Sequence, residues 1–448
     1  MGNVKGRMRS GWSALLIVSA ALLVLPLLCI VPATGQAQQP EQITWITTTA
    51  LPTVIQEALG KFHAQHPDIR VNWRPTPSGK IRDIALSLMV GNPDDLDVLA
   101  IMYGDLAAFV ESGQLTNIEG LAWTGTLKRD LKPTAQSNAS YKGALYGVPY
   151  FHAVHVYVYN MRLLKQAGFQ NPPRSWDEVI KVATTMRQRK MFNSPIVWPW
   201  NVTATADSVH WTWELITASM GGTLWDKALK PQFLDKSSPG HRALRWMVDN
   251  LRGGLIDRTS FELDPGKIVE LLGRGDIPMG FQVSFHELIR INSPGTTKEA
   301  GNFAIGAGPD KGINVARTDI FVATARARAR GGRHWQAVET FMRWLAVPDN
   351  FGRPYGALNA RGMMFRAFDT DPQVRDAWSK WVDLGQASET MARLTTFVDI
   401  VPQYMRPYFP EMRDMMNQEL QKALLGQQTV EQALQTISSR ADAFATRR

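Results

Sequence analysis

The chain has 448 residues, one cysteine and a formal net charge of +9, from 49 Lys and Arg against 40 Asp and Glu. This length exceeds what one compact core usually holds, so two domains are predicted. The basic excess is mild, whereas nucleic-acid binders gather such charge on one face or arm. The densest basic run, residues 326–333, lies between a strand-like segment and an amphipathic helix, and a solvated loop is predicted there. No nucleic-acid partner is expected.

Residues 1–37 have the layout of a secretory signal peptide: basic residues, an apolar run over residues 12–31, then small and polar residues. No second apolar run of this length follows, so the mature chain is expected to be exported and soluble. Cys29 follows Leu28, where a lipoprotein signal would need a small residue, so a lipid anchor at Cys29 is disfavoured. A periplasmic location is expected, because an unanchored protein would diffuse away from a cell that lacks an outer membrane.

The first elements after the signal predict a parallel sheet. Residues 43–75 read as an apolar strand, a helix with Ile55, Leu59 and Phe62 on one face, and an alternating strand. A helix over residues 81–91 leads into a short apolar run, residues 96–102, which is typical of a central strand covered on both faces. The strand-helix-strand order indicates an α/β fold.

The middle of the chain continues this alternation. Residues 151–160 read as a buried strand, and Ser175 with Glu178 predicts a capping box for the helix that follows. Near the end, Gly426 is typical of a helix stop, and Thr429 with Gln432 predicts the cap of the last helix.

In open sheets of this kind, ligands bind beyond the carboxyl ends of the strands, and with two such domains the natural site is the groove between them. Asp105 is the ambiguous case, because it is equally placed to cap the following helix. By position in the chain, the residues expected at the site, outside the tryptophan-rich stretch, are Thr48, Thr49, Tyr103, Asp105, Tyr150, His152, Gln282, Ser284, Arg317 and Asp319.

The tryptophan-rich stretch, residues 197–215, carries its own signal. Sugars stack their C–H faces on aromatic rings and need fixed donors and acceptors for their hydroxyls. Trp198, Trp200 and Asn201 lie in a proline-broken loop and are predicted to contact ligand; the alternative is that these tryptophans fill the core. Trp211 and Trp213 cannot share one face of a helix, so at least one of them is predicted to be core.

The sequence also bears on enzyme chemistry. The chain lacks the nucleophile-elbow, phosphate-loop and dinucleotide-binding patterns. The pair His152 and His155 would point to opposite faces of a strand, and the pair His63 and His66 has no third ligand nearby, so no metal and no cofactor are expected. Two carboxylates can come from distant parts of a chain, so a saccharide-acting cleft enzyme stays as an alternative.

Six segments, in order, resemble one family. They are residues 62–71, 96–118, 144–178, 273–281, 320–350 and 423–434. Nearly the whole mature chain is thus similar to the family 1 extracellular solute-binding proteins, the carbohydrate-binding components of bacterial ABC importers. The MYGDL segment, residues 102–106, and the many tryptophans depart from the family pattern and leave the ligand's identity open.

The resemblance implies a two-lobed periplasmic-binding-protein fold whose interleaved lobes are joined by a hinge, with the ligand cleft between them. The expected N-terminal lobe is residues 38–148 plus about 305–358, and the C-terminal lobe is residues 149–304 plus about 359–448. The expected function is that of a monomer which captures a sugar or polyol and delivers it to the membrane permease. Alternatives are signalling to a membrane sensor, or a phosphorylated polyol bound by Arg317 and Arg361.

Overall fold

The computed structural model describes residues 39–446, except residues 78–79, 92–95, 203–207, 307 and 381. Pro40–Arg448 forms one compact unit. The predicted signal peptide, with Cys29, lies outside the described residues. Within the described part, the search for a helix with the length and apolar character of a membrane span finds none.

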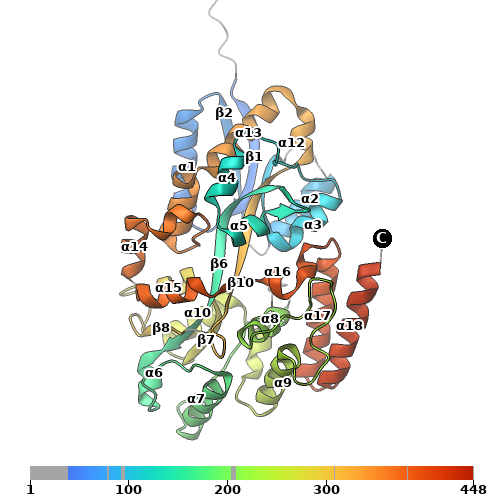
Figure 1. The fold of residues 1–448 in the computed structure, drawn as a ribbon. Coiled ribbons are helices and arrows are strands. Elements are labelled where there is room, and N and C mark those ends of the chain that lie inside the picture. The colour runs from blue at the N-terminus through green and yellow to red at the C-terminus, as the bar shows by residue number, and fades with distance from the viewer. Residues whose placement is uncertain are drawn as a thin grey trace, which may run out of the picture. The chain divides into compact units, whose positions relative to one another are not determined.

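The chain enters the fold through a strand-helix-strand unit (Figure 1). Strand β1 (Glu41–Thr48) and strand β2 (Ile69–Thr76) are parallel and are joined by helix α1 (Pro52–Gln65). The helix buries Ile55, Leu59 and Phe62, as its spacing predicts. The predicted parallel unit is confirmed.

The next strand is central, as predicted. Strand β3 (Val98–Met102) follows helix α2 (Ile81–Gly91) and pairs with β1 on one side and with β9 (Asn314–Ala323) on the other. Helix α3 (Tyr103–Glu111) begins directly after it and ends just before Gly113, whose positive φ of 71° suits a helix stop.

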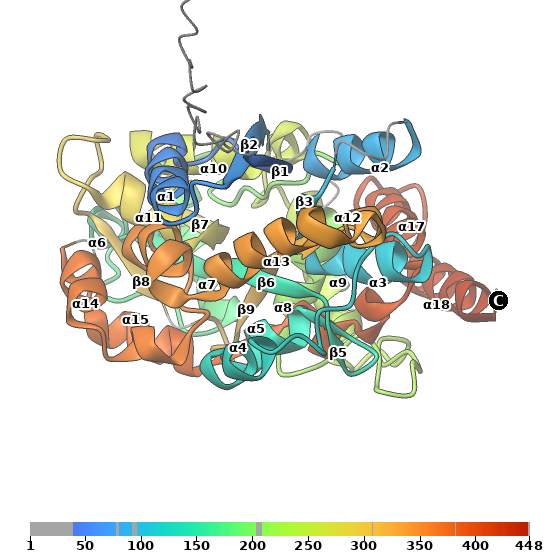
Figure 2. The same ribbon diagram turned by 90° about the horizontal axis from the view of Figure 1, so that it is seen from above.

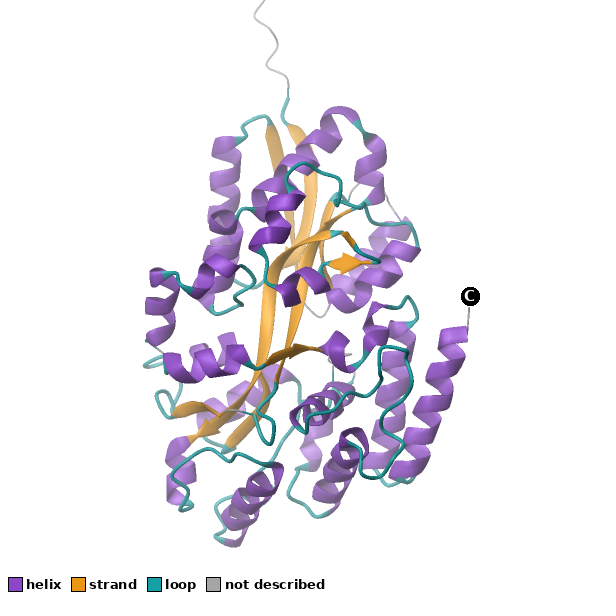
Figure 3. Ribbon diagram, viewed as in Figure 1, coloured by secondary structure: helices purple, strands orange, loops and turns teal. Residues whose placement is uncertain are grey.

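Two long strands, β6 and β9, connect the two ends of the sheet. They run lengthwise between flanking helices (Figure 3). All fourteen residues of strand β6 (Gly147–Asn160) are buried. Its first part pairs with β9, and its last part pairs with β7 (Met279–Ser284) and β8 (Phe303–Gly306). The sheet order is β2-β1-β3-β9-β6-β7, with β8 on β6 and β10 (Leu394–Thr396) on β9. The predicted α/β class is confirmed.

Helix α7 (Trp176–Gln188) is capped differently from the prediction. Ser175 Oγ accepts from the backbone N–H of Glu178 (3.1 Å), but the Glu178 carboxylate accepts from the backbone of Arg174 (2.6 Å) rather than from Ser175. Only half of the predicted capping box therefore forms.

The helices and short strands of this middle region are α4 (Thr124–Asp130), α5 (Pro133–Asn138), β4 (Ser140–Tyr141), β5 (Ala144–Leu145), α6 (Met161–Gln166), α7 (Trp176–Gln188), α8 (Val209–Ser219), α9 (Pro239–Arg252), α10 (Pro265–Arg274) and α11 (Phe285–Asn292).

The loop predicted at the arginine-rich run is wrong. Residues Ala325–Arg330 form helix α12, which leads into α13 (Gly332–Ala346). Alanine and arginine are both good helix formers, and Thr324 Oγ1 caps the first turn by accepting from the backbone of Ala327 (3.1 Å). The alternating alanines and arginines therefore form a helix and not a solvated loop.

The C-terminal region is helical. Its helices are α14 (Pro372–Ser379), α15 (Leu384–Ala392), α16 (Phe397–Ile400), α17 (Phe409–Leu424) and α18 (Val430–Thr446). Helices α17 and α18 lie side by side at one edge of the unit (Figure 2). Thr429 Oγ1 accepts from the Gln432 backbone (3.1 Å), and the Gln432 side chain accepts from the Thr429 backbone (2.8 Å), so the capping box predicted here is confirmed.

Buried side chains gather in two clusters. One surrounds β1, β3 and α13; the other is formed by α7, α8, α9, α17 and α18. The first cluster also takes in side chains from residues 268–305, which the sequence places in the C-terminal lobe. The lobe boundaries therefore stay a prediction.

Candidate functional site

A cluster of charged and aromatic side chains lies where β9 pairs with β6. In that pairing Phe151 lies opposite Asp319 and Ala153 opposite Arg317, so their side chains share one face of the sheet. The Arg317 guanidinium lies 5.6 Å from the ring centre of Phe151 and 5.3 Å from that of Trp211. Its Nη2 is 3.7 Å from Asp319 Oδ2. A cation is thus held between two aromatic rings beside a carboxylate.

The ring of Trp211 is fixed from two other directions. It stacks on Phe397, with ring centres 4.5 Å apart and an interplanar angle of 15°. Its Nε1 donates to the Tyr404 hydroxyl (2.7 Å), which donates in turn to Glu214 Oε2 (2.9 Å). The indole plane beside Arg317 is therefore held in place by side chains from α8, α16 and the segment before α17.

A second arginine approaches Phe151. The Arg361 guanidinium lies 5.6 Å from the Phe151 ring centre and 5.4 Å from that of Tyr355. Burial raises the pKa of Tyr355 to about 12, and the side chains of Arg361 and Thr48 hydrogen-bond to it. The phenol therefore stays neutral and links the end of β1 to this cluster. Tyr150 stacks on Phe321 (4.0 Å), and burial raises its pKa well above the usual value.

Strand β7 brings Gln282 to the same region. Its φ of 59° is in the left-handed range, and residues other than glycine hold such strain chiefly where the surroundings impose it, often at functional sites. Its carbonyl oxygen lies 3.3 Å from Nδ1 of His155, and its side-chain oxygen accepts from Thr212 Oγ1 (2.9 Å). The His155 ring packs edge-on against Trp211, with ring centres 5.1 Å apart.

Of the two predicted residues after β3, Tyr103 reaches the cluster indirectly. Tyr103 stacks on Tyr404, with ring centres 5.2 Å apart, and Tyr404 is the residue that holds Trp211. Asp105 is buried, and its Oδ1 accepts from Arg82 Nε (2.7 Å). Met102 occupies the N-cap of α3, so the alternative that Asp105 caps the helix is wrong.

A family profile matches residues 45–350, which is more than half of the chain; its description is bacterial extracellular solute-binding protein. The chain belongs to this family. The family's description implies an extracytoplasmic location for this solute-binding protein.

Two curated relatives match part of this chain. The mannitol-binding protein of Pseudomonas aeruginosa is 26% identical over 225 residues, which is 47% of this chain and 50% of the relative. A lipoprotein of Streptomyces antibioticus is 26% identical over 41% of each chain. This solute-binding protein thus spans half or less of the length of these relatives.

Solved structures share the fold over nearly the whole chain. Maltose-bound MalE3 of T. maritima superposes with a TM-score of 0.76 at 18% identity, covering 90% of this chain and 99% of that one. A solute-binding protein of Agrobacterium radiobacter in complex with ribitol gives 0.70 at 18% identity, covering 90% and 100%. One of Agrobacterium vitis with bound D-mannitol gives 0.66 at 18% identity, covering 90% and 97%. At these identities the likeness shows the fold alone.

The structure places the two loop tryptophans in the core. Trp198 and Trp200 are fully buried; Trp198 stacks on Phe281 (4.8 Å), and Trp200 Nε1 donates to Thr212 Oγ1 (2.9 Å). Their core alternative thus fits the structure better, and neither joins the proposed site. Trp213 is also core: its Nε1 donates to the backbone of Gly240 (2.7 Å).

The four remaining predicted residues are Thr49, His152, Asn201 and Ser284, and the backbone N–H of His152 donates to the Arg361 carbonyl (2.8 Å). Asn201 donates to the backbone of Glu262 (3.2 Å), and His152 Nδ1 lies 2.8 Å from Thr318 Oγ1. Thr49 is exposed and Ser284 is partly buried at the start of α11. These four stay predictions that the structure neither supports nor replaces.

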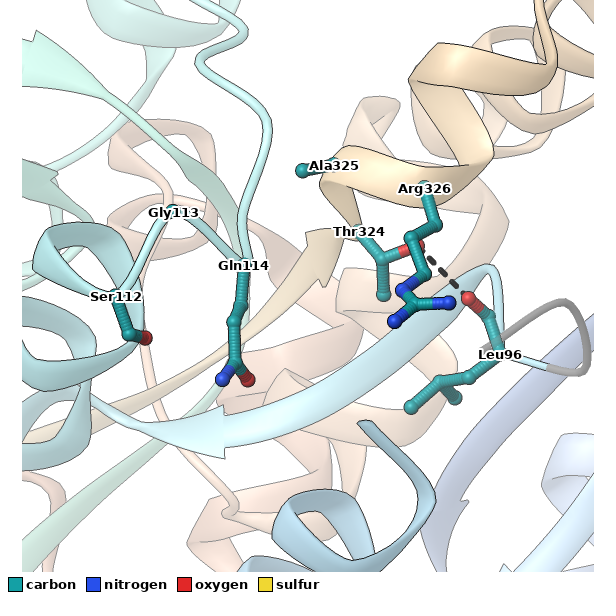
Figure 4. Close-up of a pocket in the computed structure, with 7 residues that line it drawn as sticks. All are labelled: Leu96, Ser112, Gly113, Gln114, Thr324, Ala325 and Arg326. Atoms are coloured by element: carbon teal, nitrogen blue, oxygen red, sulfur yellow. Dashed lines mark hydrogen bonds between the residues drawn. The ribbon is translucent and has the colours of Figure 1, made fainter. Parts of the chain in front are cut away.

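Two surface cavities lie away from all fourteen predicted residues. One, of about 280 Å³, is lined by Leu96, residues 112–114 and residues 324–326, and Thr324 Oγ1 donates to the Leu96 carbonyl across it (2.8 Å) (Figure 4). The other, of about 500 Å³, lies beside Gly222 and Thr395. Among the described residues, no group of three His, Cys, Asp or Glu is placed to hold a metal ion.

The sequence reasoning missed several members of the cluster. Phe151 and His155 were available from the period of two along β6, because they are four residues apart and fall on one face. Tyr355 and Tyr404 carried no comparable signal, since neither follows a predicted strand.

Proposed function

We propose that this protein captures a sugar or polyol at the cluster around Arg317 and delivers it to a membrane permease without chemical change. The observation that carries the proposal is the position of Arg317, held between Phe151 and Trp211 beside Asp319. The family and the mannitol-binding relative support the same ligand class.

The chemistry of the cluster suits hydroxyl-rich solutes. Arg317, Arg361 and the neutral phenol of Tyr355 supply donors, and Asp319 supplies an acceptor. The Phe151 ring provides an apolar face of the kind on which C–H groups of a sugar stack. Hydroxyls, which both donate and accept, match this mixture.

Transport would follow from hinge motion between the predicted lobes. Ligand favours the closed form because only there do both lobes contact it, and the permease then recognises the closed surface. Removal of residues 1–37 would leave a monomer in the periplasm with a charge of about +6, since that segment carries three basic and no acidic residues.

One observation favours a second candidate, a phosphorylated polyol. No ion pair to Arg361 occurs among the residues that the structure describes, so this guanidinium is available to an anion. A strongly salt-dependent affinity would support this ligand over a neutral sugar.

The test is tryptophan fluorescence of the mature protein, refolded after complete unfolding to remove carried-over ligand. The titrants are monosaccharides, disaccharides, oligosaccharides, polyols and their phosphates. The expected result is a saturable change with one compound class, and recovery of that compound chemically intact. Formation of a chemical product would contradict binding without catalysis. The absence of a fluorescence change with every titrant would contradict the ligand class.

A further inference from the structure

Two polar nitrogen atoms on neighbouring strands lack partners. His155 is 5% exposed, and its Nε2 is buried with no hydrogen-bond partner. The Gln282 side chain is 5% exposed, and its Nε2, which is not fully buried, donates no hydrogen bond to any residue that the structure describes. Buried polar groups in folded proteins are nearly always paired, so the buried His155 Nε2 indicates a ligand that pairs it.

The hydrogen bond on the other side of the imidazole fixes the role of His155 Nε2. Nδ1 lies 3.3 Å from the backbone carbonyl of Gln282, which can only accept, so Nδ1 carries the proton. Nε2 is then a lone-pair acceptor. Burial, and secondarily Arg317, lower the pKa of His155 to about 3, so the ring keeps this state across physiological pH.

A chain of hydrogen bonds fixes the role of Gln282 Nε2. Trp200 Nε1 can only donate, and it donates to Thr212 Oγ1 (2.9 Å). The Thr212 hydroxyl directs its own proton to Gln282 Oε1 (2.9 Å). With Oε1 held in this way, Nε2 presents its two N–H donors away from Thr212. The left-handed backbone of Gln282 adds a second constraint on the side chain.

The two side chains also lie on the same side of the sheet. His155 packs against Trp211, and Gln282 bonds to Thr212, the next residue of α8. Arg317 lies over the same Trp211 ring. The histidine acceptor and the amide donor thus belong to side chains that contact consecutive residues of α8, beside Arg317.

We propose that His155 Nε2 and Gln282 Nε2 bind one hydroxyl group of the solute, the histidine as acceptor and the amide as donor. This inference rests on the proposed function and sharpens its ligand class. A hydroxyl donates and accepts at once, whereas an ionised phosphate or carboxylate only accepts and would face the histidine lone pair. At this position the pair selects a neutral sugar or polyol over a phosphorylated one.

The experiment is calorimetric titration of the wild type and two variants, His155→Phe and Gln282→Glu. The probes are D-mannitol, ribitol, maltose, their mono-deoxy derivatives and mannitol 1-phosphate. For the neutral probe that the wild type binds, each variant is expected to raise Kd about tenfold or more. One mono-deoxy derivative should bind the wild type and His155→Phe equally, which a general structural defect would not produce.

The matched control is Tyr159→Phe, which removes another buried polar atom of β6 that has no partner among the described residues. It should leave Kd unchanged. Thr212→Val frees the amide to flip and should weaken binding less than Gln282→Glu does. In the wild type labelled with ¹⁵N-histidine, the His155 Nε2 signal should shift when the neutral probe is added, which tests the contact without any variant.

The outcomes distinguish a failure of the hydroxyl pair from a failure of the proposed function. If the wild type binds a neutral probe and both variants bind it equally well, the hydroxyl pair is wrong while the proposed function stands. Tighter binding of mannitol 1-phosphate than of mannitol would also overturn the pair. A wild type that binds none of the probes overturns the proposed function, and the inference with it.

Discussion

At the scale of single residues, the cluster depends on groups that sequence could name only in part. Arg317 and Asp319 are predicted from their position in the chain, and they lie together, within strand β9 rather than before a strand. Phe151 and Trp211, which hold the guanidinium, come from a different strand and from a helix. Their meeting depends on strand register, which a single sequence does not contain.

Arg317→Ala should weaken solute binding by about 1–3 kcal/mol, because it removes a charged donor and the guanidinium that packs between the rings of Phe151 and Trp211. Arg317→Lys should recover little of this loss, since an ammonium lacks the planar fork. Arg328→Ala is the control: Arg328 lies on α12, 4.5 Å from the ring centre of Trp335, and its loss should not change Kd. Equal Kd values for all three variants in a fluorescence titration would contradict the assignment of Arg317.

Tyr404→Phe should lower the free energy of unfolding by about 1–3 kcal/mol. The change leaves Trp211 Nε1 without its acceptor and Glu214 without one donor, at a buried position. Urea unfolding followed by circular dichroism measures the loss. Tyr159→Phe serves as the reference, because it removes a hydroxyl with no partner in the described part of the chain and should cost far less.

At the scale of elements, local chemistry predicted most helices and strands. Apolar spacing placed α1 and the central strand β3, and the Thr429–Gln432 box placed the start of α18. The two errors have different physical sources. Glu178 bonds one residue before its cap, and the arginines of α12 continue a helix that Thr324 starts.

The segment that carries Arg361 docks on β6 through a glycine. Gly362 has φ of 121°, and a Cβ there would lie 2.4 Å from the Cβ and carbonyl oxygen of His152. Gly362→Ala should therefore destabilise the fold by roughly 3 kcal/mol or more and displace Arg361, raising Kd as well. Gly295→Ala also has positive φ but meets open space, so about 1 kcal/mol is expected in the same unfolding assay. A similar cost for both glycines would show that the contact with His152 is unimportant.

At the scale of the whole molecule, the fold class and family were readable from the order of segments, but the site was not. The resemblance rests on six segments that occur in the family's order along the chain, and the family match confirms it. Trp198 and Trp200 show the limit: an aromatic-rich loop suits a sugar site and a core equally well, and only burial distinguishes them.

Three buried histidines make the stability of the whole molecule depend on pH. Burial lowers the pKa of His152 to about 4, helped by Lys132, and it lowers the pKa of His155 and of His210 to about 3, helped by Arg317 and Arg413 respectively. Each pKa is below the ordinary value of 6.5, so between about pH 6.5 and 4 the unfolded chain binds protons that the folded chain refuses. The contribution of these neutral histidines to the free energy of unfolding is therefore fully present above pH 6.5. The free energy of unfolding should fall as pH decreases below this value, by up to about 1.4 kcal/mol per pH unit for each histidine.

Urea unfolding at pH 7.5, 6.0 and 5.0 measures this slope. His210→Gln should make the slope shallower whatever the change costs at pH 7.5, because it removes one of the histidines whose pKa burial lowers; His241 and His286, whose pKa values burial also lowers, should keep contributing. His63 is a useful contrast: its pKa is lowered too, by burial first and then by Arg70, but it lies at the end of α1 and is only partly buried. His63→Gln should therefore leave most of the slope in place. An unfolding free energy that stays constant from pH 7.5 to 5.0 in the wild type would mean that these rings are protonated in the folded protein, and the neutral acceptor assigned to His155 would be lost with it.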